Sequence, residues 1–152
     1  YIKLEDYKGA VRYFNWFNKN FPDDIGYPNL FFEWTFALYK TNKLQLAEKK
    51  ALEAHFSNTY IFDKFFGQPI VPIDKFEYSN IDAASYTHYF TYSAEQAQFQ
   101  DFAIWLKNLI QSEKFANASA QFIDIHKQLN IEEDENKRQD LLKQSNLLLE
   151  NY

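Results

Sequence analysis

The 152-residue chain contains no cysteine, three glycines and four prolines. Without cysteine there can be no disulfide scaffold, thiolate metal site or thiol nucleophile. A β-sheet domain of this length needs many more turn residues, so the scarcity of glycine and proline favours long helices joined by short connections. No apolar run approaches the roughly 18–20 residues of a membrane-spanning helix, and the first six residues show no signal-peptide pattern. We therefore expect a cytoplasmic protein with no membrane partner.

Charge and aromatic content restrict the class of protein further. Sixteen basic residues stand against twenty-one acidic residues, and the net charge is −5. A dedicated nucleic-acid binder normally carries a strongly basic face, so we expect no nucleic-acid partner. Aromatic residues make up 20% of the chain, which excludes general disorder because disordered chains are poor in aromatics.

Three C-terminal segments have apolar residues at the i, i+3, i+4, i+7 spacing of an amphipathic helix, over residues 99–110, 115–129 and 141–152. Ser93 and Gln96 form a capping-box pair before the first segment. The acidic run 132–135 precedes the third segment. We interpret this run as a solvated helix start rather than a cation site, because acids in a first turn interact favourably with the helix dipole.

The first sixty residues contain a repeated pattern. One copy reads Tyr7-x2-Ala10-x3-Phe14-x7-Pro22, and the second combines Phe31, Trp34, Thr35 and Leu38 with Leu44-x2-Ala47, Ala51 and Ala54. Small residues let paired helices approach closely, and large residues fill the space between successive pairs. The pattern resembles the tetratricopeptide repeat. The resemblance implies an all-α fold, a right-handed stack of antiparallel helix pairs.

The resemblance extends over residues 1–60, and residues 61–152 are expected to be divergent C-terminal helices of the same single domain, 1–152. Phe17 replaces a usual alanine of the repeat, Thr35 a usual glycine and Ala51 a usual aromatic. Beyond the repeats, residues 58–67 indicate a short helix that Gly67 closes. Residues 68–72 are expected to be extended, and residues 80–92 to form a further, irregular helix.

Residues that could carry chemistry are few. His55, His88 and His126 are too far apart in sequence for a helical metal pair. No phosphate-binding loop, dinucleotide motif or nucleophile elbow is present, and the spacing of Asp63, His88 and Glu95 does not support a catalytic set. We therefore predict no enzyme activity, no cofactor and no metal.

The resemblance also implies a binding surface, because one helix face of such repeats lines a concave groove that takes peptides. On residues 28–40 this face carries Phe32 and Phe36, flanked by Asn29, Glu33 and Lys40. The alternative is that a neighbouring helix covers the same face, since helices that are hydrophobic all round are usually buried on both sides.

We therefore expect a non-catalytic protein-interaction or scaffolding module that binds a peptide or helix of unknown identity in a concave groove. Glu33 and the two phenylalanines would disfavour an acidic peptide tail, so an apolar or aromatic ligand is expected on Phe32 and Phe36. Two alternatives stay open: a homo-oligomerising structural domain, and an enzyme whose site is assembled from scattered residues. A closed polar pocket with a buried histidine–carboxylate pair would favour the enzyme.

Overall fold

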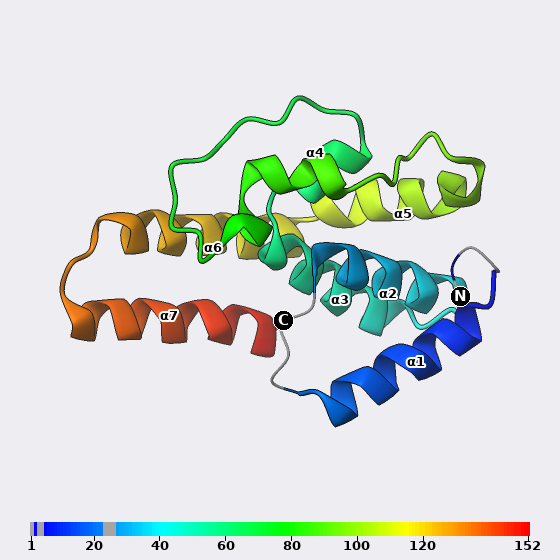
Figure 1. Ribbon diagram of the computed structural model, residues 1–152, viewed down its shortest axis with the longest axis horizontal. Coiled ribbons are helices and arrows are strands. Elements are labelled where there is room, and N and C mark those ends of the chain that lie inside the picture. The colour runs from blue at the N-terminus through cyan, green and yellow to red at the C-terminus, as the bar shows by residue number, and fades with distance from the viewer. Residues whose placement is uncertain (1, 3–4, 23–26) are drawn as a thin grey trace.

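The computed structural model describes residues 2, 5–22 and 27–152, in which every regular element is helical (Figure 1). The prediction of an all-α fold is confirmed. The α-helices are α1 (Tyr7–Asn20), α2 (Pro28–Lys40), α3 (Leu44–Ser57), α4 (Ile61–Phe65), α5 (Gln100–Gln111), α6 (Glu113–Ile131) and α7 (Glu135–Glu150). Three short 3₁₀-helices, η1 (Asn80–Asp82), η2 (Ala84–Tyr89) and η3 (Ala97–Phe99), lie between α4 and α5.

The α2–α3 pair is a hairpin whose turn is fixed by local backbone chemistry. Asn42 adopts a positive φ of 60°, and its N–H donates to the carbonyl of Tyr39 at 3.0 Å. The N–H of Lys43 donates to the carbonyl of Leu38 at 2.9 Å. These two bonds form a Schellman motif, which ends α2 and reverses the chain. Ala47, Ala51 and Ala54 of α3 are fully buried, as the repeat pattern implies for close helix pairs.

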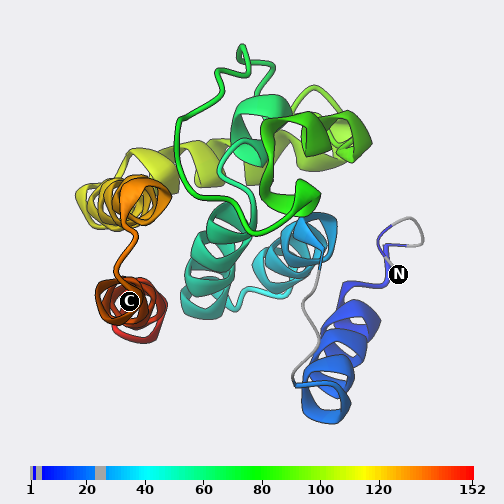
Figure 2. The same cartoon turned by 60° about the vertical axis from the view of Figure 1, so that its left-hand side comes forward.

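Helix α1 packs on α2 through Ala10, Val11 and Phe14, and the Phe14 ring stacks on Trp34 at a centroid distance of 5.3 Å. Figures 1 and 2 both place α1 at one end of the molecule, beside α2. Helices therefore occur where the repeat pattern places them up to residue 57. The right-handed repeat stack itself stays a prediction.

Gly67 closes α4, as predicted. Its φ is 68°, its N–H donates to the carbonyl of Lys64 at 3.1 Å, and the N–H of Gln68 donates to the carbonyl of Asp63 at 2.8 Å. Residues 68–79, which we call the strap, then run without helix from α4 across to α6 (Figure 1). Residues 68–72 are not helical, as expected, and the irregular helix predicted for residues 80–92 occurs as the two 3₁₀-helices η1 and η2, which end at Tyr89.

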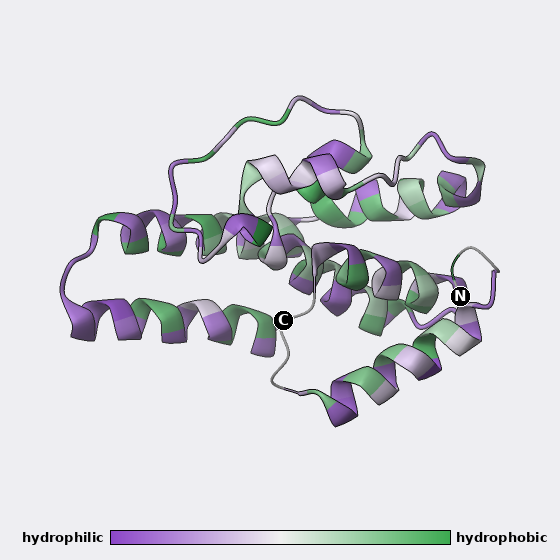
Figure 3. Cartoon of the chain, viewed as in Figure 1, coloured by the Kyte–Doolittle hydropathy of each residue, from purple (hydrophilic) through white to green (hydrophobic). Residues whose placement is uncertain are grey.

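The C-terminal helices begin at side-chain caps. Ser112 Oγ accepts from the N–H of Phe115 at the start of α6, and Asp134 accepts from two backbone N–H groups at the start of α7. The second half of the acidic run 132–135 is thus a helix start, as interpreted from the sequence, whereas Glu132 is the C-cap of α6. The Ser93–Gln96 pair forms a turn before η3, and α5 begins only at Gln100, so this pair lies further from the helix than its pattern predicts. Figure 3 shows hydrophilic and hydrophobic residues sharing each long helix.

One continuous core of buried apolar side chains extends from α1 to α6 and so crosses residue 60. Its centre is aromatic: Phe36, Phe65, Phe90 and Phe99 are all fully buried. A smaller cluster formed by Ile125, Leu129 and Leu141 holds α7 on α6. Within the described part of the chain, no helix is long and apolar enough to cross a membrane.

Candidate functional site

The two phenylalanines predicted to line a groove lie inside the core. Phe32 is 1% exposed and Phe36 is 0% exposed. The Phe36 ring packs edge-on against Phe99 and Phe102 at centroid distances of 4.7 and 5.1 Å, and Phe32 stacks on Tyr92 at 5.1 Å. Residues 90–102, which we call the covering segment, occupy this face. The prediction of an open groove on Phe32 and Phe36 is therefore corrected: the alternative, a face covered by the chain itself, is observed.

Asn29 and Glu33 hold neighbouring parts of the chain in place. The Asn29 side chain donates to the carbonyl of Tyr89 at 3.2 Å and accepts from the Tyr86 hydroxyl at 3.1 Å. The Tyr92 hydroxyl donates to Glu33 Oε1. Burial, followed by this bond to Glu33, raises the pKa of Tyr92. The contacts explain why polar residues lie beside an apolar face, and a role of Asn29 and Glu33 in partner binding stays a prediction.

Of the five predicted groove residues, Lys40 alone is exposed. It lies in the last turn of α2, where a cation interacts favourably with the helix dipole. Its ammonium is 5.4 Å from the centroid of the Tyr7 ring, close enough for a cation–π contact. Its predicted part in partner binding is not contradicted and stays a prediction.

An aromatic surface that the sequence analysis did not assign lies on α1. Tyr13, Trp16 and Phe21 are 40%, 53% and 47% exposed, and Phe17 between them is half-buried. The rings touch one another: Tyr13 stacks on Trp16 at 6.1 Å, Trp16 meets Phe21 at 5.8 Å, and Phe17 meets Phe21 at 5.5 Å. We call these four residues the α1 aromatic stripe. Single exposed aromatics are ordinary, but a contiguous patch marks an interaction site.

The stripe exists because the apolar side of α1 is too wide for one neighbour. At roughly 100° per residue, the apolar residues run around the helix from Val11 through Phe14 and Phe17 to Trp16, which is more than half of its circumference. Helix α2 covers Val11 and Phe14, which are 4% exposed. Figure 2 shows α1 at the edge of the helix array with α2 on one side.

The edge of the stripe is basic. Lys8, Arg12 and Lys19 are exposed on α1, and the helix contains no acidic residue. None of the three cations forms an ion pair with any residue in the described ranges. The surface therefore combines exposed aromatic rings with three exposed cations that form no ion pair within the described ranges, in a chain whose net charge is −5.

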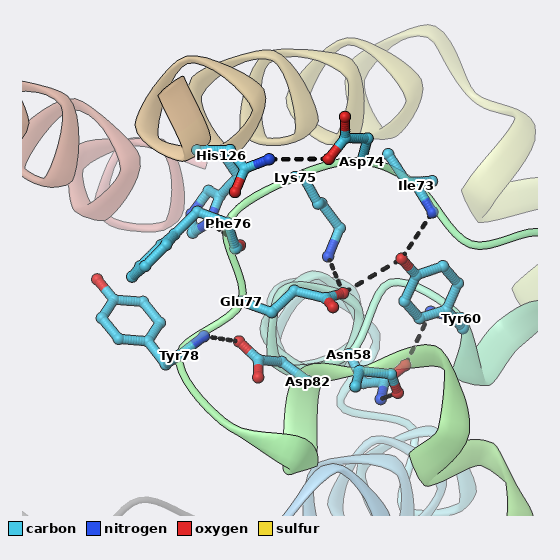
Figure 4. Close-up of polar contacts among 12 residues, drawn as sticks. Asn58, Tyr60, Ile73, Asp74, Lys75, Phe76, Glu77, Tyr78, Asp82 and His126 are labelled. Atoms are coloured by element: carbon cyan, nitrogen blue, oxygen red, sulfur yellow. Dashed lines mark hydrogen bonds and ion pairs between the residues drawn. The ribbon is translucent and has the colours of Figure 1, made fainter. Parts of the chain in front are cut away.

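A second group of polar residues lies at the strap, where it buries a charged side chain (Figure 4). Lys75 Nζ lies 2.9 Å from Glu77 Oε2, and its side chain is 3% exposed. The Tyr60 hydroxyl donates to the same carboxylate oxygen at 3.2 Å and accepts from the N–H of Ile73 at 3.0 Å. Burial raises the pKa of Tyr60. A buried ammonium is costly unless it is paired, so Lys75 stays bonded to Glu77. The Tyr60 hydroxyl, which bonds both Glu77 and Ile73, joins the strap to the start of α4.

Asn58, which follows α3, fixes the segment that comes directly after the strap. Its side chain is fully buried and donates to the carbonyls of Ile81 and Ala83 at 2.9 and 3.0 Å. Its Oδ1 accepts from the N–H of Tyr60 at 2.9 Å. This buried amide thus positions η1 against α4 (Figure 4).

His126 fastens the middle of the strap to α6 and α7. Its Nδ1 lies 3.1 Å from the carbonyl oxygen of Phe76, its Nε2 lies 3.2 Å from Ser145 Oγ, and its ring stacks on Phe122 at 4.1 Å. A carbonyl can only accept, so Nδ1 carries the proton and Nε2 accepts from Ser145. Burial lowers the pKa of His126, which keeps the imidazole neutral.

A cavity of about 140 Å³ lies between the strap, α6 and α7, and its lining includes Thr59, Lys75, His126 and Ser145. Within the described residues, Thr59 Oγ1 is buried there without a hydrogen-bond partner. Asp82 also lines the cavity, and its carboxylate accepts from the backbone N–H groups of Tyr78 and Ser79. Because His126 binds a backbone carbonyl and a serine, we interpret the group as a structural fastening.

His55 lies on α3, where its Nε2 is 2.7 Å from Ser119 Oγ and its ring stacks on Phe62. Its Nδ1 is buried without a partner. Burial, and secondarily the Lys75 cation, lowers the pKa of His55 to about 4. This is a packing residue with a strongly preferred neutral form.

Other residues considered for chemistry are not brought together. No hydrogen bond or ion pair joins any two of Asp63, His88 and Glu95, all of which lie in the described ranges. His88 is exposed beside Tyr89. Within the same ranges, no group of three or more His, Cys, Asp or Glu residues is arranged to hold a metal ion.

No protein-family model matches this chain, and no curated protein or solved structure matches it either. The resemblance to the tetratricopeptide repeat therefore rests on the residues quoted for it and stays a prediction.

Sequence reasoning missed the α1 aromatic stripe, but a signal was present. Phe17 departs from the repeat pattern by replacing a usual alanine, and it lies three and four residues from Phe14 and Tyr13. On a helix such positions share one side, so the departure widens the apolar arc beyond what one neighbouring helix covers.

Proposed function

We propose that this chain is a non-catalytic protein-interaction module whose partner binds to the α1 aromatic stripe. The observation that carries the proposal is the set of mutually contacting aromatic rings left exposed on α1. Tyrosine and tryptophan are the residues that most often dominate binding energy at protein interfaces. The proposal keeps the function expected from the sequence and moves its surface from α2 to α1.

The buried fastenings support the non-catalytic part of the proposal. The charged side chains beneath the strap are paired with each other, and His126 is satisfied by Phe76 and Ser145. Groups that are satisfied within the chain rigidify it and are poorly placed to transfer protons to a substrate. A rigid domain with exposed, mutually contacting aromatic rings on α1 is suited to recognition.

The test compares Trp16→Ala with a matched control, Tyr89→Ala. Tyr89 is 67% exposed, so both substitutions truncate an exposed aromatic, but Tyr89 lies on η2 rather than on α1. Partners captured from an extract of the source organism are identified with the unsubstituted domain, purified, and titrated against all three proteins by calorimetry. Loss of a central interface tryptophan typically costs ~2 kcal/mol or more, which is about a 30-fold weaker affinity.

We expect this loss for Trp16→Ala and near-normal binding for Tyr89→Ala, with similar thermal unfolding of all three proteins. If every partner binds Trp16→Ala as tightly as the unsubstituted domain, the α1 aromatic stripe is not the interaction surface.

A further inference from the structure

Resting on the proposed function, we infer that the α1 aromatic stripe binds an amphipathic α-helix of a partner protein, and that this helix carries acidic residues at the edge of its apolar face. The inference names the chemistry of the partner, and it follows from the shape of the exposed surface and from the charges at its edge.

The shape fits a helix. Tyr13 and Phe21 are eight residues apart, so the stripe extends about 12 Å along the axis of α1. Tyr13, Trp16 and Phe17 lie on one side of α1, and Phe21 is the residue directly after its last turn. A ridge of side chains on one helix packs into the groove of a second helix at an interaxial distance of about 8–10 Å. Helix α1 already packs in this manner against α2 on its other apolar side.

The charge of the edge selects an acidic helix. Lys8 and Lys19 are eleven positions apart, or about 16 Å along α1, and Arg12 lies between them. Helix α1 itself contains no acidic residue, and the carboxylate of Asp6 at its N-cap accepts from the N–H of Gly9. A partner helix can reach these cations with three carboxylates, the second about one turn and the third about three turns from the first. Its apolar side then covers the stripe. Complementary charges at an interface rim speed association and exclude partners of the wrong charge.

The same charges argue against two other occupants. A second copy of the chain docked symmetrically through α1 would bring Lys8, Arg12 and Lys19 against the same three cations. An anionic membrane surface would attract α1 but repel a chain whose net charge is −5. A protein helix can place its acids opposite the three cations and so avoid both penalties.

The experiment uses two synthetic peptides of about 18 residues with the same apolar face, one bearing glutamates and the other lysines at the flanking positions. Binding of each labelled peptide to the whole domain is measured by fluorescence anisotropy at low and high salt. An exposed ion pair typically changes affinity by about two- to fivefold, so three pairs should favour the acidic peptide by about tenfold. This advantage should shrink at high salt because exposed charges are screened.

Two sets of variants separate the charge from the apolar surface. The triple variant Lys8→Glu, Arg12→Glu, Lys19→Glu should reverse the preference between the peptides, and a triple glutamine variant should abolish it. Circular dichroism checks that both keep their helices. Trp16→Ala should weaken both peptides, because it removes apolar contact that does not depend on charge.

Each other outcome overturns the inference in a distinguishable way. Equal binding of both peptides that still depends on Trp16 shows an interaction surface with no preference for acids. If neither peptide binds but Trp16→Ala still weakens the binding of natural partners, the proposed function stands and the partner is not an acidic amphipathic helix. Binding to phosphatidylserine-containing vesicles in place of the peptides indicates a membrane surface. A dimer in sedimentation that Trp16→Ala dissociates indicates a second copy.

Discussion

Phe36→Ala is the substitution that most directly separates a core role from a binding role for the α2 face. Phe36 is fully buried, and its ring lies between Tyr7 of α1 and the covering segment. The ring centroids of Tyr7, Phe99 and Phe102 are 5.3, 4.7 and 5.1 Å away, all in edge-on arrangements. The substitution therefore removes one ring from a contact that joins three parts of the chain.

The magnitude follows from this packing. Truncating a buried phenylalanine to alanine typically costs about 3–5 kcal/mol, which includes the cavity left behind. Edge-on aromatic pairs add about 0.5–1.5 kcal/mol each beyond buried area, and Phe36 makes three of them, so the upper part of this range is expected. A domain is typically stable by about 5–15 kcal/mol, so this loss is a large fraction of the total.

Urea denaturation followed by circular dichroism at 222 nm gives the free energy of unfolding. We expect Phe36→Ala to lower it by about 4 kcal/mol and to lower the Tm by about 8–16 °C. Trp16→Ala, which truncates a half-exposed ring of α1, serves as the comparison and should cost about 1 kcal/mol or less. A change of under 1 kcal/mol for Phe36→Ala, with an unchanged denaturant slope, would refute the placement of Phe36 in the core.

Two further predictions concern the backbone and a buried histidine. Gly67→Ala should lower the free energy of unfolding by about 1 kcal/mol, because Gly67 has φ 68° and an added Cβ meets nothing within 4 Å, so the cost is conformational strain; an unchanged urea midpoint would contradict this. The pKa of His55 is lowered to about 4 in the folded state from an ordinary value near 6.5, so the unfolded chain takes up the proton first as the pH falls. The stability that neutral His55 contributes should be full above pH 6.5 and lost as the pH falls towards 4. Urea unfolding of the unsubstituted protein and of His55→Phe across this range should show the unsubstituted protein losing stability relative to the variant as the pH falls from 6.5 towards 4, whereas a constant difference between the two would exclude His55 as the group responsible.

Features governed by local chemistry could be predicted from the sequence. Gly67 marks the end of α4 because its missing Cβ permits a positive φ. Asp134 lies at the start of α7 because its carboxylate accepts bonds from otherwise unpaired N–H groups. Each of these signals involves residues within four positions of one another, which is the range over which a single sequence is informative.

Contacts between distant residues could not be predicted in the same way. Phe32 meets Tyr92 across sixty positions, and His126 meets Phe76 across fifty. An apolar residue on a helix indicates that its face is covered, but not whether a distant segment or a partner covers it. The groove hypothesis for α2 was wrong on this point, because the covering segment returns to the same face.

The α1 aromatic stripe also could be predicted only in part from the sequence. The width of the apolar arc of α1 is visible in the sequence through Tyr13, Trp16 and Phe17. Which half of that arc α2 covers depends on how Phe14 stacks on Trp34, and this is a property of the folded chain. Only the structure shows that Tyr13 and Trp16 on the other half are 40% and 53% exposed.

The area of the open half also sets the strength of the interaction. A fully buried aromatic side chain removes about 150–250 Å² from water, so three rings exposed to roughly half leave about 300 Å² to be covered. With a similar apolar area on the partner helix, the gross gain is about 15 kcal/mol at ~25 cal/mol per Å². Association costs about 4–15 kcal/mol in lost freedom of motion, so the net gain is at most about 11 kcal/mol. We therefore expect an affinity no tighter than about 10 nM, to which the basic edge of α1 adds a contribution that depends on salt. A nanomolar complex that depended on Trp16 alone would require contacts well outside the α1 aromatic stripe.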